Sequence, residues 1–169
     1  MTLVLRRGET QDLTAINTIY NYYVEKTAIT FDITPWSDAK RLTWFESYQT
    51  ADAIHPLWVA NDDNRLLGFA YTSQYSEKAA YAISAKITIY LDPHYQQKGL
   101  GTELYQRLFA DLAESTFHRI YAHITLPNTP SLKLHQKFGF KQIGVLDQVG
   151  FKFERFHSVG IFEKSISSR

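Results

Sequence analysis

Apolar residues recur along the chain with two different spacings, which together predict an alternation of helices and strands. Between Asp12 and Val24 they repeat every three to four residues, as on one face of an amphipathic helix. A second helical stretch begins after Ser37, a residue type that caps helices well, and runs to about Tyr48. The segment between them, Thr27–Trp36, is predicted to be an aromatic loop.

Stretches rich in apolar and β-branched residues predict the strands. They are Leu3–Arg6, Leu57–Ala60, Leu66–Thr72, Ala82–Leu91, Ile120–Ile124, Lys141–Val149 and Phe153–Phe162. The second and third flank an Asn-Asp-Asp-Asn-Arg turn and predict a hairpin, and the last two are typical of closing antiparallel strands. This order predicts an α+β fold with a mixed, mostly antiparallel sheet that has helices on both faces.

Two glycines mark the segment that follows the strand at Ala82–Leu91 and begins a further helical stretch. The segment consists of Gln96, Gln97, Lys98, Gly99, Leu100, Gly101 and Thr102. Glycines let the backbone turn sharply and bring N–H groups close to a ligand. The first turn of a helix offers unpaired N–H donors and the positive end of its dipole, which favour phosphate. The segment therefore predicts a pyrophosphate site, although a turn that needs glycine for its geometry alone is an equally good interpretation.

The two common nucleotide motifs do not fit this segment. A phosphate loop requires Gly-Lys-Ser or Gly-Lys-Thr, whereas here Lys98 precedes the glycines. A dinucleotide fingerprint requires a third glycine at the position of Leu104. Further along, Thr129 is predicted to cap a short helix with Pro130 at its first position, and Gly139 is predicted to end that helix.

The order of these motifs resembles the acyl-coenzyme A site of the GNAT N-acetyltransferase superfamily: a strand, Gln-Gln-Lys-Gly-Leu-Gly, a helix, a strand, an asparagine and a short helix ending in Phe-Gly-Phe. Three further motifs are similar to its phosphinothricin and methionine-sulfoximine N-acetyltransferase branch. They are Leu126-Pro127-Asn128-x-Pro130-Ser131 with Leu134-His135, Thr30-Phe31-Asp32-x-x-Pro35-Trp36, and Val149-Gly150-Phe151-Lys152. The resemblance spans nearly the whole chain and implies one GNAT domain over residues 1–169.

The resemblance also implies that acetyl-CoA is the co-substrate. Its pantetheine arm is expected on the backbone of Ile89, Tyr90 and Leu91, and its pyrophosphate on the glycine segment. Asn128 and Ser131 are expected to contact it as well. The alternative for Asn128 is a helix-entry residue that satisfies local N–H groups, and both roles can hold at once.

Acetyl transfer to an amine calls for acid–base groups. An alkyl amine with a pKa near 10.4 is almost wholly protonated at pH 7, so a base that removes the proton helps the attack on the thioester. By resemblance, His135 is the acid–base candidate; the alternative is a helix histidine that packs or bonds to the backbone. By resemblance, Lys86 stands where the branch normally has a glutamate credited with deprotonating the substrate. A lysine acts as a base only if burial lowers its pKa by several units, and the alternative is a solvated or salt-bridged strand lysine. Candidates for a replacement base are Glu77, Asp32, Glu46 and Tyr81; by resemblance Glu77 is closest to the pocket, and its alternative is a solvated loop acid.

The expected acceptor pocket also departs from the branch. It is expected to include Phe31, Ser76, Lys78, Tyr81 and Thr88. Ser76 and Ala82 stand where relatives often carry arginines, and Phe156 and Ser158 replace a tryptophan and an aspartate. Arginine pairs bidentately with carboxylate, so we expect an altered amine specificity, with Lys78 and Lys86 replacing part of the charge.

Composition narrows the functional classes. The net charge of +1 gives no reason to expect nucleic acid or an anionic membrane as partner. Because the chain has no cysteine, transfer through an enzyme thiol is excluded and direct transfer is expected. The histidine spacing does not match a metal motif, so no metal is expected. We expect a cytoplasmic enzyme, since no signal peptide or membrane span is evident. The resemblance implies a homodimer.

Two other functions are compatible with the sequence. One is an acyl-CoA-binding module with decayed catalysis, acting as a sensor or assembly subunit, which Lys86 motivates. The other is acetylation of protein or peptide N-termini, which an open groove rather than a narrow pocket would favour.

Overall fold

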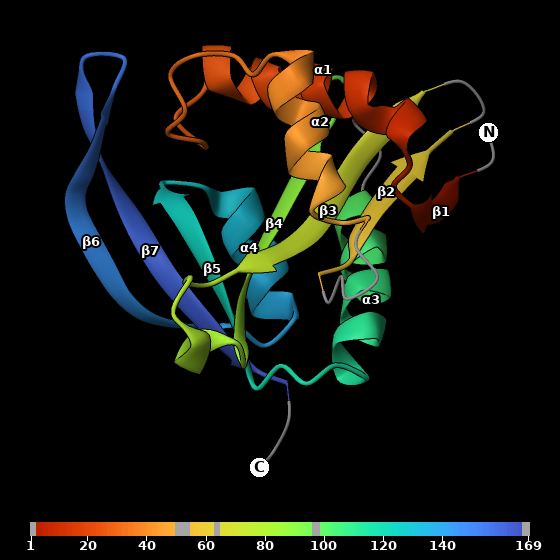
Figure 1. Ribbon diagram of the computed structural model, residues 1–169. Coiled ribbons are helices and arrows are strands. Elements are labelled where there is room, and N and C mark those ends of the chain that lie inside the picture. Colours follow the sequence, from red (N-terminus) through yellow and green to blue (C-terminus); the bar gives the residue numbers. More distant parts are fainter. Residues whose placement is uncertain (1–2, 50–54, 63–64, 96–98, 167–169) are drawn as a thin grey trace. The chain divides into compact units, whose positions relative to one another are not determined.

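The computed structural model describes residues 3–49, 55–62, 65–95 and 99–166. The helices are α1 (Leu13–Lys26), α2 (Asp38–Glu46), α3 (Leu100–Ala113) and α4 (Thr129–Lys137), with short 3-10 turns at Thr10–Asp12 and Ala79–Tyr81. The strands are β1 (Val4–Arg7), β2 (Leu57–Asn61), β3 (Leu66–Gln74), β4 (Ser84–Leu91), β5 (Arg119–Leu126), β6 (Lys141–Lys152) and β7 (Arg155–Ser165). Figure 1 shows these elements along the chain.

The seven strands form one sheet in the order β1-β2-β3-β4-β5-β7-β6. Strand β1 pairs antiparallel with β2, as do β2 with β3, β5 with β7, and β6 with β7. Strand β4 runs parallel to β5. The predicted α+β class with a mixed, mostly antiparallel sheet is therefore confirmed.

The chain forms two compact units, and α1 and β4 run through both of them. The first unit contains residues 1–21, 36–73 and 88–115, and the second contains residues 22–35, 74–87 and 116–169. Among the described residues, no helix has the length and apolar character needed to cross a membrane.

Helices cover opposite faces of the sheet in the first unit. Leu57 pairs with Tyr71, and Trp58 with Ala70, so the neighbouring residues Leu57 and Trp58 face opposite sides. On one side, Trp44 of α2 lies 5.2 Å from the ring of Tyr71. On the other, the indole nitrogen of Trp58 donates to Asp111 of α3 at 2.6 Å. This arrangement matches the predicted helices on both faces.

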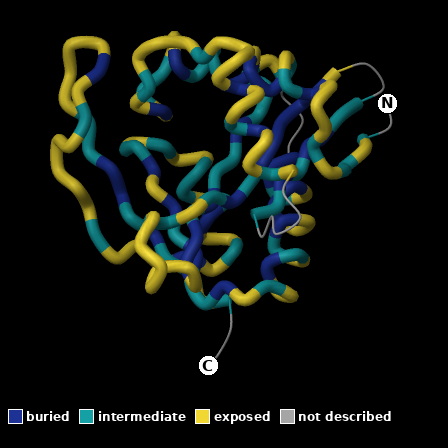
Figure 2. Tube along the Cα trace, viewed as in Figure 1, coloured by how far each residue is buried: buried dark blue, intermediate teal, exposed yellow. Residues whose placement is uncertain are grey.

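Burial follows the position of each strand in the sheet. The first five residues of β3 are buried, as expected for an interior strand, whereas β6, at the end of the sheet, is exposed along most of its length (Figure 2). The last two strands are longer than the sequence predicts. The turn between them consists of Phe153 and Glu154, both at positive φ, so Phe153 does not begin β7 as predicted.

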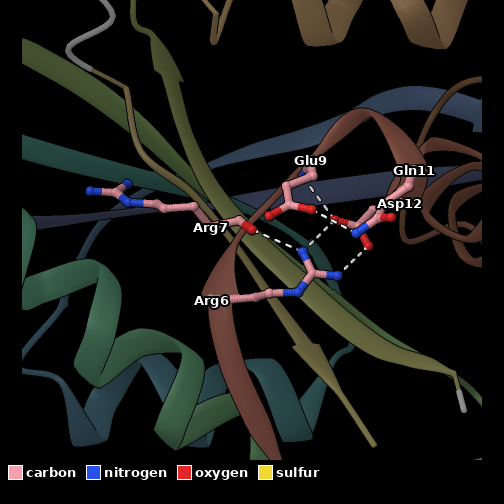
Figure 3. A network of polar contacts seen from close by, with 5 residues as sticks. All are labelled: Arg6, Arg7, Glu9, Gln11 and Asp12. Carbon is pink, nitrogen blue, oxygen red and sulfur yellow. Dashed lines mark hydrogen bonds and ion pairs between the residues drawn. The ribbon is translucent and has the colours of Figure 1, made fainter. Parts of the chain in front are cut away.

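A network of polar contacts ties the end of β1 to the start of α1 (Figure 3). Both terminal nitrogens of Arg6 donate to the carboxylate of Asp12 at 2.7 Å, and the backbone N–H of Glu9 donates to it at the same distance. The side chain of Asp12 is 5% exposed and that of Arg6 is 30% exposed. The hydrogen bonds from Arg6 to Asp12 raise the pKa of Arg6. The Asp12 carboxylate therefore stabilises the turn between β1 and α1.

We expect Asp12→Ala to lower the free energy of unfolding by about 2 kcal/mol, because it leaves the Arg6 charge and a backbone donor without their acceptor. Urea denaturation measures the change. In the control Arg65→Ala, which removes two long ion pairs of an exposed arginine, with Asp62 at 3.9 Å and Asp92 at 3.5 Å, the change should stay below about 1 kcal/mol. Equal losses in the two variants would contradict the structural role of Asp12.

Candidate functional site

The predicted pyrophosphate segment lies in the first unit, at the start of α3. Gln96, Gln97 and Lys98 lie outside the described residues. Before them, the chain leaves β4 in a turn in which the N–H of Tyr95 donates to the carbonyl of Asp92 at 3.0 Å. After them, Gly99 is the N-cap of α3, which confirms that the glycine segment begins a helix.

Gly99 is required for its backbone conformation. Its φ is 104°, in the left-handed region that glycine adopts without strain. A Cβ added there would meet no atom within 4 Å, so crowding does not explain the glycine. The N-cap glycine has no side chain that could accept a hydrogen bond from the first turn of the helix. Leu100 and Gly101 are buried, whereas Thr102 is half-buried. These features fit an anion at the helix start.

The strand residues expected to support the pantetheine arm lie at the end of β4. Ile89 and Leu91 are half-buried, like Thr88, which was expected in the acceptor pocket. The Tyr90 ring is buried between aromatic neighbours, at 5.2 Å from Tyr20 and 5.6 Å from Phe69. The side chain of Tyr90 is therefore a packing residue, and a role of its backbone in holding the pantetheine arm stays a prediction.

The second unit brings Asn128, Ser131 and His135 together at the start of α4. The side-chain oxygen of Asn128 accepts a hydrogen bond from the N–H of Ser131 at 3.2 Å. Asn128 is therefore the N-cap, and the prediction that Thr129 caps this helix is wrong. Both residue types are good caps, and the one just before the first helical residue, with a non-helical ψ of 72°, takes the role. The alternative interpretation of Asn128 as a helix-entry residue is thus confirmed. Gly139 follows the helix at φ 79°, as its predicted end.

His135 is only 3% exposed and bonds to its own helix. Its Nδ1 lies 2.8 Å from the carbonyl oxygen of Ser131 and 3.3 Å from the hydroxyl. Because a carbonyl only accepts, Nδ1 carries the hydrogen and Nε2 carries the lone pair in the neutral ring. Burial lowers the pKa of His135, although the backbone hydrogen bond opposes this. His135 is therefore a helix histidine that is hydrogen-bonded to the backbone, which was the alternative interpretation of this residue.

Lys86 lies on a face of the second unit that carries several ionisable groups. It is half-buried on β4, and its register partner on β5 is Tyr121. His123, two residues further along β5, lies on the same face. Burial, and next the charge of Lys86, lower the pKa of His123. The pKa of Tyr121 is raised by burial and by Glu163. His123 cannot be recognised from the sequence, because the register between two strands does not follow from the sequence of either strand.

The predicted site residues in the loop before β4 differ in their exposure and contacts. Glu77 and Lys78 are exposed, and Ser76 is half-buried. Glu77 has no ion pair or hydrogen bond with another residue in the described part of the chain, so it has the surroundings of a solvated acid. Tyr81 is different, because its ring lies 5.4 Å from Tyr75. Tyr75 in turn lies 4.8 Å from Tyr121, so Tyr81 is connected to the Lys86 face.

Phe31 lies in an aromatic loop that the hairpin of β6 and β7 holds in place. The ammonium group of Lys152 donates to the carbonyl of Thr30 at 2.8 Å. The ring of His157 lies 6.2 Å from that of Phe31. A side chain at Gly150 would collide with Phe31, which explains the glycine there. The position of Phe31 therefore depends on residues more than 100 positions away in the sequence.

Arg41 is a buried charge that the sequence patterning did not reveal. It is 2% exposed, and its guanidinium carbon lies 4.3 Å from the ring centroid of Trp36, 4.6 Å from Trp44 and 4.8 Å from Tyr20. Its Nε donates to Asn17 at 3.3 Å. Burial lowers its pKa. Cation–π contacts thus take the place of a carboxylate partner.

A hollow of about 580 Å³ in the first unit contains none of the predicted site residues. Its lining includes Arg7, Tyr48, His55, Asp111 and Glu114. Arg7 and Asp111 form an ion pair at 3.0 Å. Within the described ranges, no group of three histidine, aspartate or glutamate side chains could hold a metal.

Comparisons with known proteins agree with the resemblance. The model of the acetyltransferase (GNAT) family matches residues 16–140. The chain is 42% identical to an N-acetyltransferase of Streptomyces griseus, over 96% of this chain and 86% of that protein. It is 39% identical to the phosphinothricin N-acetyltransferase of Streptomyces coelicolor, over 96% and 95%. A crystal structure of a phosphinothricin acetyltransferase from Sinorhizobium meliloti in complex with acetyl-CoA has a TM-score of 0.89 and 29% identity, over 98% of this chain and 89% of that one.

The lowered pKa of His135 predicts a pH-dependent stability. The unfolded chain binds a proton near the ordinary pKa of about 6.5, whereas the folded chain resists it to lower pH. The contribution of the neutral ring is therefore fully present above about pH 6.5 and is lost as the pH falls toward the folded pKa. We expect the unfolding free energy of the wild type to fall more steeply from pH 7.5 to 5 than that of His135→Gln, as measured with urea. Parallel curves would contradict this.

Proposed function

The chain belongs to the GNAT acetyltransferase family and is an acetyl-CoA-dependent N-acetyltransferase, and we propose that it transfers the acetyl group directly to a small amine of the amino-acid-analogue type. Relatives of the phosphinothricin branch match almost the full length of the chain, which supports an acceptor of this class. Direct transfer follows because no cysteine is present to carry the acetyl group.

The observation that carries the coenzyme site is the start of α3 at a left-handed Gly99, which follows the turn after β4. The positive end of the helix dipole at this start suits a diphosphate. By resemblance, the backbone of Ile89, Tyr90 and Leu91 is proposed to hold the pantetheine arm, and Asn128 and Ser131 are proposed to contact the coenzyme. When bound, acetyl-CoA supplies the activated acetyl group.

His135 is the first acid–base residue that we propose. His135 holds its Nε2 lone pair in a fixed direction, because Nδ1 is bonded to Ser131. In this neutral form it can accept a proton from the reacting amine or pass it on; it can protonate the departing thiolate only after gaining a proton itself. Lys86 and Glu77 are the other candidates for the acid–base role. Glu77 is exposed to solvent, whereas Lys86 is half-buried.

The acceptor is proposed to differ from phosphinothricin. The pocket residues Phe31, Ser76, Lys78, Tyr81 and Thr88 include no arginine, so a carboxylate would meet the point charges of Lys78 and Lys86 instead of a bidentate fork. The second candidate function, an acyl-CoA-binding module with decayed catalysis, rests on the lysine at position 86. Acetylation of any amine in a broad panel would contradict this second candidate function. The cytoplasmic location stays a prediction from the sequence.

We also propose that the chain forms a homodimer through the surface of the β6–β7 hairpin. This hairpin surface consists of Ile143, Val145, Leu146, Val149, Phe151, Phe153 and Phe156, each more than 40% exposed. The rings of Phe151 and Phe156 lie 5.0 Å apart across the two strands. Strand β6 is also the last strand of the sheet, so its outer edge can pair. A second copy supplies the same apolar surface and edge, which makes a self-complementary interface the simplest occupant.

The coenzyme site is tested by Gly99→Ala. A side chain at φ 104° costs about 1–2 kcal/mol, so the turn must rearrange. We expect the Kd for coenzyme A, measured by calorimetry, to rise about tenfold. The control Gly144→Ala, at a glycine with ordinary φ and open space, should bind like the wild type. If the wild type gives no heat with coenzyme A or acetyl-CoA, or releases no coenzyme A with any amine of a broad panel, the proposed function is wrong.

The dimer is tested by the double variant Phe151→Lys with Phe156→Lys. Two charges on the apolar hairpin surface should convert the dimer into a monomer, as measured by size-exclusion chromatography with light scattering. Val4→Lys, at an exposed apolar residue of β1, is the matched control and should stay dimeric. A monomeric wild type, or a dimeric double variant, would contradict the proposal.

A further inference from the structure

The parallel register of β4 and β5 places a histidine beside the lysine that departs from the branch. Lys86 pairs with Tyr121, and alternate residues of a strand share a face. His123 is therefore on the same side of the sheet as Lys86, one step further along β5. Burial of the ring, and next the positive charge of Lys86, lower the pKa of His123.

The surroundings of His123 leave its imidazole open for a proton. The residue is exposed, and its ring makes no hydrogen bond to another residue within the described part of the chain. Its register partner on β7 is Ile161, which is not ionisable. Glu163 of β7 lies opposite Tyr121, and Tyr75 packs on Tyr121. Arg119, two residues before Tyr121 on β5, and Lys141, opposite Glu163 on β6, share this face. The charged or titratable groups that the described elements place on or against it are thus Lys86, Tyr121, Glu163, Tyr75, Arg119 and Lys141.

We propose that His123 is the general base that takes the proton from the acceptor's ammonium group, the task that the resemblance assigns to a glutamate where Lys86 stands. The inference rests on the proposed acetyl transfer. His123 is favoured over Glu163, because Tyr121 lies between Glu163 and Lys86 in the register of the three strands. It is favoured over Glu77, because a defined strand position places it more rigidly than an exposed loop does.

The proton balance of the step is simple. A neutral ring nitrogen of His123 accepts one proton from the ammonium, directly or through one water, and leaves a neutral amine. The amine nitrogen then forms a bond to the thioester carbon while the carbon–sulfur bond breaks. The second proton of the amine goes to the departing thiolate, which leaves as the free thiol. His123 returns its proton to solvent.

Lys86 assists this role through its charge. A nearby cation disfavours the imidazolium, so it acts with burial to keep His123 neutral to lower pH. The neutral ring is the form that can accept a proton. Activity that depends on it should therefore be present at pH 7 and decline only as the pH falls below the ordinary histidine pKa of about 6.5.

The test compares His123→Gln with the wild type. We expect kcat/KM for the amine to fall about 100-fold or more, the usual size of a general-base contribution. The acid limb of the wild-type pH profile should disappear, while the Kd for coenzyme A stays unchanged. Glu163→Gln is the matched control on the same face. It should keep the wild-type kcat/KM and the acid limb of the pH profile. Adding Lys86→Glu to His123→Gln should restore part of the rate, because it supplies a carboxylate base.

A readout that does not depend on turnover is the NMR titration of the His123 ring. Lys86→Gln should raise the pKa of His123, because a neighbouring positive charge is removed. An unchanged pKa, or a His123→Gln variant within threefold of the wild-type rate, would overturn the assignment and leave the proposed function intact. A wild type that binds coenzyme A but acetylates no amine would overturn the proposed function and this step with it.

Discussion

The parallel pairing of β4 with β5 is the constraint on which the chemistry of the chain depends. Parallel neighbours cannot be joined by a tight turn, so the chain must leave the sheet after β4 and return through a crossover. The crossover contains α3, which starts at the left-handed Gly99. The same ladder sets Lys86 opposite Tyr121, and through that register it determines which residues of β5 share the face of Lys86. One pairing thus accounts both for the helix start proposed to bind the coenzyme and for the proposed acid–base groups.

Local signals predicted the elements well, since they depend on short-range spacing. The helical stripe behind Gly99 and the helix end at Gly139 are examples, and both are present. The failure at Thr129 is also local: two adjacent residues can cap a helix, and the backbone conformation of Asn128 decides between them. The sequence could not predict the face that carries His123, because strand register depends on how two distant segments align.

Arg41 shows a second limit of sequence patterning. A helix arginine is normally interpreted as exposed, yet this one is buried among rings from α1, α2 and the loop before α2. A buried guanidinium without a carboxylate is costly unless other groups take up its charge. The aromatic residues that do so are spread over more than twenty positions, and each of them is unremarkable alone. The cluster therefore accounts for part of the aromatic content, which is 15% of the chain.

The lysine at position 86 changes the balance of the proposed reaction rather than simply removing a base. An ammonium group about 5 Å from a second cation, at an effective dielectric constant of about 20, is disfavoured by about 3 kcal/mol. That corresponds to a decrease of about two units in the pKa of the acceptor amine, which brings it closer to the pKa of a histidine. The lysine thus weakens binding of the protonated acceptor but favours its loss of a proton. A glutamate at the same position would do the reverse, since its charge holds the ammonium in place. With the lysine, a weaker and neutral base such as an imidazole suffices to remove the proton from the acceptor.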